Sequence, residues 1–347
     1  MTTARMTDIV RRWGLIGVLL VLFAGFSLTL PDTFPTSGNM RDILTSQPPL
    51  IFIALGAMIV LKVGEFDLSL GATLAFSQYL VILLMKDTSM GWGLAVVVCI
   101  AVGAMVGLAN AALVVGVGIS SFIATIGVST ILGGLLTWIS NGNVPIFGGA
   151  PHAFLRLAND EIFGIPLPVW YALVAAIAIW ILLEYTVFGR ELGAVGANLD
   201  AARLSGLRPV RARVAAFVLA GVLAAVGGVL LTARVGAADA STGLQELLAA
   251  YAAAFLGMSA VRPGFFNVWG TLIAIFVVAV GITGIQLHGA DAWVTPVFNG
   301  GVLLIAVSVS TVAARRQMAA GGRAKRRLMM KDAGGPAPTQ TAHSVDA

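Results

Sequence analysis

Polar side chains that could bind a small polar solute occur inside long apolar stretches of this chain. If those stretches cross a membrane, each such group is costly unless it faces a cavity or another polar group. We interpret these residues, and one phenylalanine beside them, as candidates for a translocation path or its gate: Asp67, Ser69, Asn110, Phe122, Thr125, Asn141, Glu246 and Gln286. Their hydroxyl, amide and carboxyl groups could hydrogen-bond to sugar hydroxyls weakly. The alternative, hydrogen bonding between neighbouring helices at about 0.6 kcal/mol each, stays open for each polar residue.

The carboxylates within or beside the apolar stretches differ in what their positions predict. Asp67 precedes Leu68 and Ser69 in a motif-like run, so we expect it to serve gating or structure. Glu246 begins an apolar stretch, where the positive end of a helix dipole alone would favour a carboxylate. Glu184 lies near the end of another stretch and is expected to reach the membrane interface.

A polar loop at residues 189–213 carries five arginines and a short helix signal. Asn198 is a good N-cap, Asp200 falls in the first turn, and Gly206 lies where a left-handed C-cap is expected. A helix of about seven residues is too short to be stable alone in water. We predict that it docks on a partner through exposed Leu204 and Leu207. The segment expected to couple to that partner comprises Gly196, Asn198, Asp200, Ala201, Ala202, Arg203, Leu204, Ser205 and Gly206. The alternative is an amphipathic segment resting on lipid headgroups.

Residues for enzymatic chemistry are scarce in this chain. It has one cysteine, Cys99, and three histidines far apart in sequence, without metal-ligand spacing. We find no nucleophile with a nearby base at a plausible position. The phosphate-binding pattern Gly-x-x-x-x-Gly-Lys-Ser/Thr is also missing. The sequence therefore predicts no catalytic residue, no metal and no cofactor, and any use of ATP requires a partner.

The composition points to lipid as the solvent. Of 347 residues, 58% are hydrophobic and 11% are charged, whereas about 25% are charged in soluble domains. A membrane helix needs about 20 apolar residues. We predict an all-α polytopic membrane protein with about ten spans: Trp13–Leu30, Pro49–Val63, Leu68–Met85, Trp92–Val115, Phe122–Ile139, Leu167–Val187, Val214–Ala233, Leu244–Ala260, Trp269–Leu287 and Trp293–Val312. The second and third are joined only by residues 64–67, so we expect this pair to be irregular or re-entrant.

The basic residues orient the stack of spans. With both termini cytoplasmic, only Arg41, Lys86, Arg156 and Arg234 of the 21 Lys and Arg residues lie outside. This is the bias of the positive-inside rule and gives no indication of nucleic-acid binding. We predict a cytoplasmic N-terminus at 1–12, a transmembrane domain at 13–312 and a basic, disordered cytoplasmic tail at 313–347 that lies along anionic lipid. The first span is expected to be an uncleaved signal anchor.

Four stretches of the chain, in order, resemble the ribose-type sugar ABC importer permeases. The run Gly196–Gly206 looks like the family's cytoplasmic loop, and Val63–Gly71 is similar to its Gly-Gly-Ile-Asp-Leu-Ser-Val-Gly signature. Ser121–Gly127 with Ile139–Gly142 matches a Pro-Ser-Phe-Ile-Ala-Thr-Leu-Gly and Ser-Asn-Gly pair. Residues 246–271 resemble the late Glu-Leu-Asp…Gly-Thr stretch. The chain departs from the family's pattern at Ser120, Leu248, Arg262-Pro263 and Glu65, the last of which stands where the family usually has Gly.

The resemblance implies a division of labour in the bacterial inner membrane. Two copies of such a permease, or one copy and a paralogue, form a translocation path between them. A cytoplasmic ABC ATPase subunit docks on the loops, and an extracytoplasmic sugar-binding protein delivers the solute.

Other functions remain open from the residues alone. An ion-gradient-driven secondary transporter could use Asp67 and Glu246 as a carboxylate pair, although no internal repeat is evident. An ABC permease for branched-chain amino acids is a nearer alternative. The motifs Asp67–Gly71 and Ala201–Gly206 favour sugar over amino acid.

Overall fold

The computed structural model describes residues 2–88, 90–142, 146–148, 150–291 and 293–308. Helices make up nearly all of it: α1 Thr2–Thr29, α2 Ser37–Ser46, α3 Pro48–Lys62, α4 Ser69–Asp87, α5 Trp92–Ala111, the π-helix η1 Ala112–Val117, α6 Ser121–Ile139, α7 His152–Asn159, α8 Leu167–Tyr185, α9 Val187–Ala197, α10 Leu199–Leu204, α11 Pro209–Val235, α12 Thr242–Gly257 and α13 Val268–Leu287. A further helix, Val294–Ser308, follows α13. Two antiparallel pairs of very short strands complete the described part: β1 Ile146–Phe147 with β4 Ala237–Ala238, and β2 Glu161–Ile162 with β3 Ile165–Pro166.

The all-α membrane architecture is confirmed. Each of the ten predicted spans falls on a helix, and eight helices of the described chain are long and apolar enough to cross a membrane. The remaining two, α12 with 16 residues and the helix Val294–Ser308, are shorter than that. The count of ten spans and the cytoplasmic termini therefore stay predictions, and the basic tail predicted at 313–347 lies outside the described residues.

The prediction that the second span is irregular is wrong, because that span is the regular helix α3. α3 is regular, and α2 and α3 together form a 26-residue span interrupted only near Gln47. Every residue of α3 from Pro48 to Leu61 is buried, because apolar side chains cover the helix on all sides. The irregular backbone is confined to the turn 63–68, where Gly64 adopts a left-handed φ of 86°.

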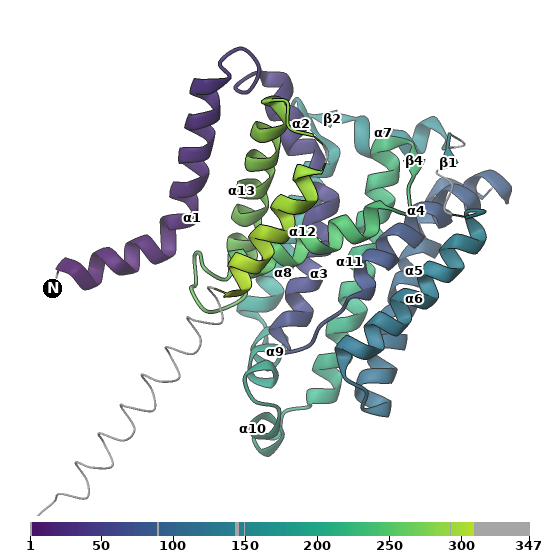
Figure 1. The fold of residues 1–347 in the computed structure, drawn as a ribbon. Coiled ribbons are helices and arrows are strands. Elements are labelled where there is room, and N and C mark those ends of the chain that lie inside the picture. Colours follow the sequence, from purple (N-terminus) through teal and green to yellow (C-terminus); the bar gives the residue numbers. More distant parts are fainter. Residues whose placement is uncertain (1, 89, 143–145, 149, 292, 309–347) are drawn as a thin grey trace, which may run out of the picture.

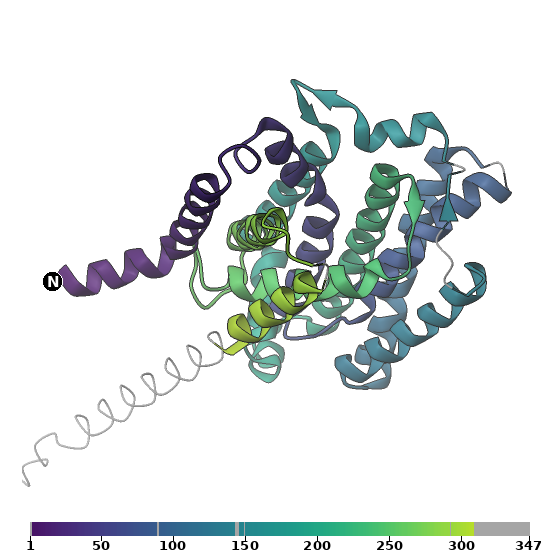
Figure 2. The same ribbon diagram turned by 45° about the horizontal axis from the view of Figure 1, so that its top comes forward.

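α3 and α11 form the centre of the bundle (Figure 1). α11 packs closely against α3, α4 and α5. A methyl group added to Gly221 of α11 would overlap the backbone of Gly103 in α5, and one on Gly228 would overlap the backbone of Leu74 in α4. Small residues allow this approach between membrane helices, whose apolar surfaces gain little from leaving lipid. α1 stands to one side of this core (Figure 2) and contacts mainly α13.

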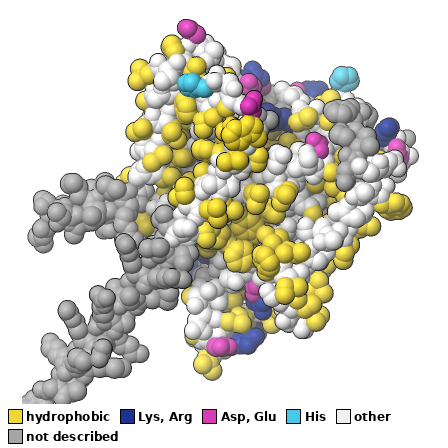
Figure 3. All heavy atoms as spheres, viewed as in Figure 1, with side chains coloured by type: hydrophobic (Ala, Val, Ile, Leu, Met, Phe, Trp, Pro, Cys, Tyr) yellow, Lys and Arg dark blue, Asp and Glu magenta, His cyan; other side chains and the backbone are white. Residues whose placement is uncertain are grey.

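The distribution of surface side chains agrees with a membrane protein. Hydrophobic side chains cover the middle of the face seen in Figure 3, while charged side chains gather mostly toward its two ends. α10 lies at one of those ends and projects from the bundle (Figure 1). The loop predicted at 189–213 is itself largely helical, because α9 occupies its first part and α11 begins at Pro209.

Candidate functional site

Four of the predicted path residues meet in one buried network. Asp67 is 1% exposed, and its Oδ1 accepts hydrogen bonds from the Ser69 N–H at 2.9 Å and the Ser69 hydroxyl at 2.6 Å. Asn110, in the last turn of α5, donates from Nδ2 to Asp67 Oδ1 at 3.2 Å and to Ser69 Oγ at 2.7 Å. Thr125 of α6 accepts from the Leu68 N–H at 3.1 Å. The carboxylate is thus enclosed by donors from two segments, and Thr125 of a third segment holds the adjoining backbone.

Two further residues fix the backbone of the same turn. Tyr251 of α12 accepts from the Asp67 N–H at 2.9 Å and donates to the Asp67 carbonyl at 3.1 Å. Ser121, which begins α6, accepts from the Phe66 N–H at 3.1 Å. Neither was among the sequence candidates. A signal for Tyr251 was present, because a phenol inside an apolar helix must find a hydrogen-bond partner.

Burial and hydrogen bonding oppose each other at Asp67, which lies in the turn between two spans. Burial raises the pKa of its carboxyl to about 6, and the hydrogen bonds from Ser69 and Asn110 counteract that shift. One hydrogen-bond acceptor of the network lacks a donor among the described residues. Asn110 Oδ1 is buried and accepts no hydrogen bond from the residues that the structure describes.

The other predicted path residues lie elsewhere. Asn141 and Gln286 are exposed at the C-terminal ends of α6 and α13, away from the N-terminal end of α6 that holds the network. Gln286 donates to Thr295 at 3.0 Å. Phe122 is 52% exposed on the outer face of α6. Glu246 is half-buried near the start of α12, with Oε2 unpartnered among the described residues.

An ion pair that the sequence did not predict lies beside the network. Glu65, the departure from the family's glycine, contacts Arg213 near the start of α11 at 2.5 Å, and each side chain is 15% exposed. The pair joins the turn 63–68 to the helix that follows α10.

The predicted caps of α10 are present. Asn198 Oδ1 accepts from the Ala201 N–H at 2.9 Å, and Asp200 lies 3.8 Å from Arg203. Gly206 adopts a φ of 78°, and the N–H groups of Gly206 and Leu207 donate to the carbonyls of Arg203 and Ala202. This is a Schellman C-cap, which satisfies carbonyls that the helix end leaves free.

The exposure of α10 agrees with only part of the prediction. Leu204 is 91% exposed, as expected for a side chain that awaits a partner. Leu207, predicted to be exposed, is half-buried against the main core, because the chain turns back there toward α11. Ala202 is buried.

α9 anchors α10 to the bundle through a close backbone contact. A methyl group on Gly196 would overlap the Lys62 carbonyl oxygen at the end of α3. On the other side of the same contact, a methyl group added to Gly64 would lie 3.4 Å from Gly196 Cα. The coupling segment and the Asp67 network therefore meet at the same end of the molecule. Among the described residues, no group of three or more His, Cys, Asp or Glu side chains could hold a metal ion.

Comparison with known proteins identifies relatives of nearly full length. A family described as branched-chain amino acid transport system / permease component matches residues 39–307. An L-arabinose ABC transporter permease of Azospirillum brasilense is 33% identical over 301 residues, covering 86% of this chain and 87% of the relative. A ribose import permease of Bacillus subtilis is 35% identical over 270 residues, covering 78% of this chain and 83% of the relative.

More distant relatives carry different solute names. A D-allose transport system permease of Escherichia coli is 28% identical over 298 residues, covering 86% of this chain and 91% of the relative. An autoinducer 2 import permease of Yersinia enterocolitica is 29% identical over 326 residues, covering 90% and 96%. No solved structure shows significant similarity to the chain.

Proposed function

The chain belongs to the family of monosaccharide ABC importer permeases, and from this premise we propose that it carries a pentose, hexose or related sugar derivative across the bacterial inner membrane. The observation that supports this most strongly is the similarity along most of the chain to permeases named for arabinose, ribose and allose. It favours a sugar permease over a secondary transporter or an amino-acid permease.

We infer that α10 transmits the work of a cytoplasmic ABC ATPase subunit. The helix is capped at both ends and projects from the bundle, and it presents Leu204 to solvent. An exposed leucine on a helix too short to be stable alone is suited to a groove on a partner. The Gly196 contact with the end of α3 would pass a displacement of α10 to the turn 63–68.

The Asp67 network is proposed to form the fixed base of the gate rather than its solute-binding surface. Its carboxylate is enclosed by donors and leaves no room for a sugar. The buried and unpartnered Asn110 Oδ1 is the acceptor in this network that a passing hydroxyl or a water molecule could use.

The path itself is proposed to run between two copies of the chain along α6. This helix exposes Phe122, Gly127, Thr130 and Gly134, and Asn141 is exposed in the turn that follows it. Methyl groups added to either glycine would meet nothing within 4 Å, so a second copy could approach closely. Small and polar residues at an exposed helix surface are typical of contacts between membrane helices. An extracytoplasmic binding protein would deliver the solute to this path.

A cross-linking experiment tests the dimer. Thr130→Cys should form a disulfide-linked dimer in membranes, because the two α6 helices face each other. Val174→Cys, which is 64% exposed on α8, is the matched control and should stay monomeric. Equal cross-linking of the two variants would count against the α6 interface.

Reconstituted transport tests the function. The chain, its ATPase and its binding protein in proteoliposomes should take up one of L-arabinose, D-ribose or D-allose in a manner that requires internal ATP. Leucine should not be carried, and a protonophore should not stop uptake. Uptake by this chain alone that collapses with the proton gradient would instead support a secondary transporter.

A further inference from the structure

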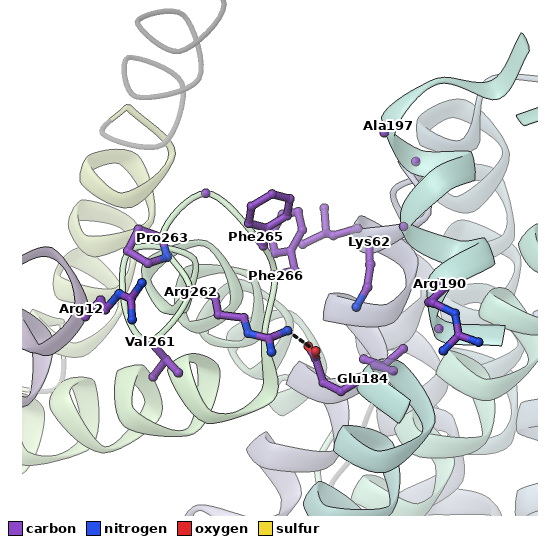
Figure 4. Close-up of a pocket in the computed structure, with 16 residues that line it drawn as sticks. Arg12, Lys62, Glu184, Arg190, Ala197, Val261, Arg262, Pro263, Phe265 and Phe266 are labelled. Carbon is purple, nitrogen blue, oxygen red and sulfur yellow. Dashed lines mark hydrogen bonds and ion pairs between the residues drawn. The ribbon is translucent and has the colours of Figure 1, made fainter. Parts of the chain in front are cut away.

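A cationic pocket lies at the same end of the molecule as α10, separate from the Asp67 network. It has a volume of about 870 Å³ and is bounded by the ends of α3 and α8, by α9, by Arg12 of α1 and by the loop 261–266 (Figure 4). Segments far apart in the sequence therefore converge on this cavity. The backbone fixes part of its rim, because Val261 donates from its N–H to the Arg12 carbonyl at 3.0 Å and adopts a φ of 60°.

The charges that line the pocket are unbalanced. Four cationic side chains, Arg12, Lys62, Arg190 and Arg262, line the pocket, but only one carboxylate, Glu184, does so. Arg262 forms an ion pair with Glu184 (Figure 4). Among the residues that the structure describes, the other three cations have no carboxylate within 4.0 Å. A half-enclosed cavity with this excess of positive charge attracts an anion.

The shape of the pocket leaves room for a ligand. Gly193 of α9 faces it, and a methyl group there would meet only the end of the Lys62 side chain, at 3.8 Å. The neighbouring glycines 189 and 196 instead pack directly on backbone atoms of α8 and α3. Phe265, which is 72% exposed, adds an apolar surface to the rim.

The position favours a lipid over a soluble anion. Lys62 and Glu184 lie in the last turns of membrane-length helices, and Arg12 begins the apolar part of α1. On the predicted orientation these ends lie at the cytoplasmic headgroup level. Basic pockets between membrane helices on that side bind anionic headgroups. A guanidinium group can donate two hydrogen bonds to the oxygens of one phosphate.

We propose that this pocket binds the phosphate headgroup of an anionic phospholipid. Lys62 and Arg190, which line the same side of the pocket in Figure 4, are the cations that contact it, and Arg12 adds positive charge on the opposite side. The exposed Phe265 would then lie beside the first part of the acyl chains. This site is independent of the sugar that the permease carries.

Lipid binding to the purified full-length chain tests the proposal. Native mass spectrometry in a neutral detergent would follow titration with phosphatidylglycerol and, separately, phosphatidylcholine. We expect one saturable phosphatidylglycerol adduct and no comparable phosphatidylcholine adduct. The double variant Lys62→Gln, Arg190→Gln should weaken that adduct by about tenfold or more. Arg208→Gln, Arg211→Gln removes two exposed arginines outside the pocket and should bind like the parent.

A steric variant tests the need for space in the pocket separately from the need for its positive charge. Gly193→Leu occupies the part of the cavity beside the Lys62 side chain while keeping all the cations, and should weaken the adduct; Gly193→Ala should keep it. Equal lipid binding by both double variants would overturn the proposal, as would an undiminished adduct in Gly193→Leu. Loss of the adduct in millimolar inorganic phosphate, with no preference between the two lipids, would assign the site to a soluble anion and also reject the lipid.

Discussion

The turn 63–68 and helix α10 lie close together at one end of the molecule but use their polar residues in opposite ways. In the turn, the Asp67 carboxylate is 1% exposed and is held by Ser69 and Asn110. In α10, Asn198 caps the helix, the charged Asp200 and Arg203 are exposed, and Leu204 is 91% exposed. The turn completes its contacts within this chain, whereas α10 leaves a leucine exposed, which we propose is the contact surface for another protein.

Two contacts join these regions, and each involves a residue within the family-like motifs. Gly196 packs on the carbonyl of Lys62, and Glu65 pairs with Arg213. A displacement of α10 would therefore reach the turn through α9 and α11. If this view is correct, substitutions in the turn should mainly lower stability and substitutions in α10 should mainly affect coupling.

The largest effect on stability is expected for Asp67→Ala. It leaves the Ser69 N–H and hydroxyl without their acceptor and removes one of the two acceptors of the Asn110 amide, and each unsatisfied buried group costs about 1–3 kcal/mol. Thermal unfolding of the purified chain should show a loss of about 3 kcal/mol or more. Asp200→Ala, which alters an exposed carboxylate of α10, should change stability by less than about 0.5 kcal/mol. Similar losses in the two variants would contradict the contrast.

Gly196→Ala should be the next most damaging change. The added methyl group overlaps the Lys62 carbonyl, and forced overpacking costs about 1–3 kcal/mol. Gly193→Ala on the same helix has space and should be neutral or stabilising by up to about 1 kcal/mol. The two variants should be compared by thermal unfolding and by uptake. If Gly196→Ala proved as stable as the parent, α9 would not be tightly packed on α3.

Glu65→Gln should have an intermediate effect of about 1–2 kcal/mol. An exposed ion pair contributes about 0–1 kcal/mol to stability, whereas breaking a fully buried pair costs about 3–5 kcal/mol. The burial of the Glu65–Arg213 pair lies between these two cases. A double-mutant cycle with Arg213→Gln would measure the coupling energy. Asp160→Asn, in the exposed pair with Arg156, is the reference and should change little. A coupling energy near zero would remove this link between turn and α11.

Leu204→Asp should have the smallest effect on folding. The side chain touches little of its own protein, so thermal stability should stay within about 0.5 kcal/mol of the parent. A marked loss of stability would show that Leu204 packs within the chain, and the contrast between the two regions would then fail.

The helices and the caps of α10 could be predicted from sequence because their signals are local. Apolar runs located all eight membrane-length helices of the described chain, and Asn198 and Gly206 marked both ends of α10. Asp67, Ser69, Asn110 and Thr125 were also identified, because polar groups stand out in apolar segments. Which of them meet could not be predicted, since that depends on how α5, α6 and α12 pack.

The residues that the sequence missed depend on tertiary contacts. Glu65 appeared only as a departure from a motif, and its partner Arg213 lies 148 positions away. Leu207 looked exposed because the turn back toward α11 is not encoded in the loop itself. The irregularity expected across residues 49–85 is limited to the turn 63–68, because α3 is stabilised by burial on all sides rather than by an amphipathic pattern.

The central claim is that α10 couples this permease to an ATPase, and sugar-stimulated ATP hydrolysis in proteoliposomes tests it most directly. The assembly of parent chain, ATPase and sugar-loaded binding protein is compared with the same assembly carrying Leu204→Asp or Leu204→Met. The account predicts that Leu204→Asp abolishes both stimulation and uptake while the chain remains folded, and that Leu204→Met behaves like the parent. Full stimulation and uptake with Leu204→Asp would contradict it.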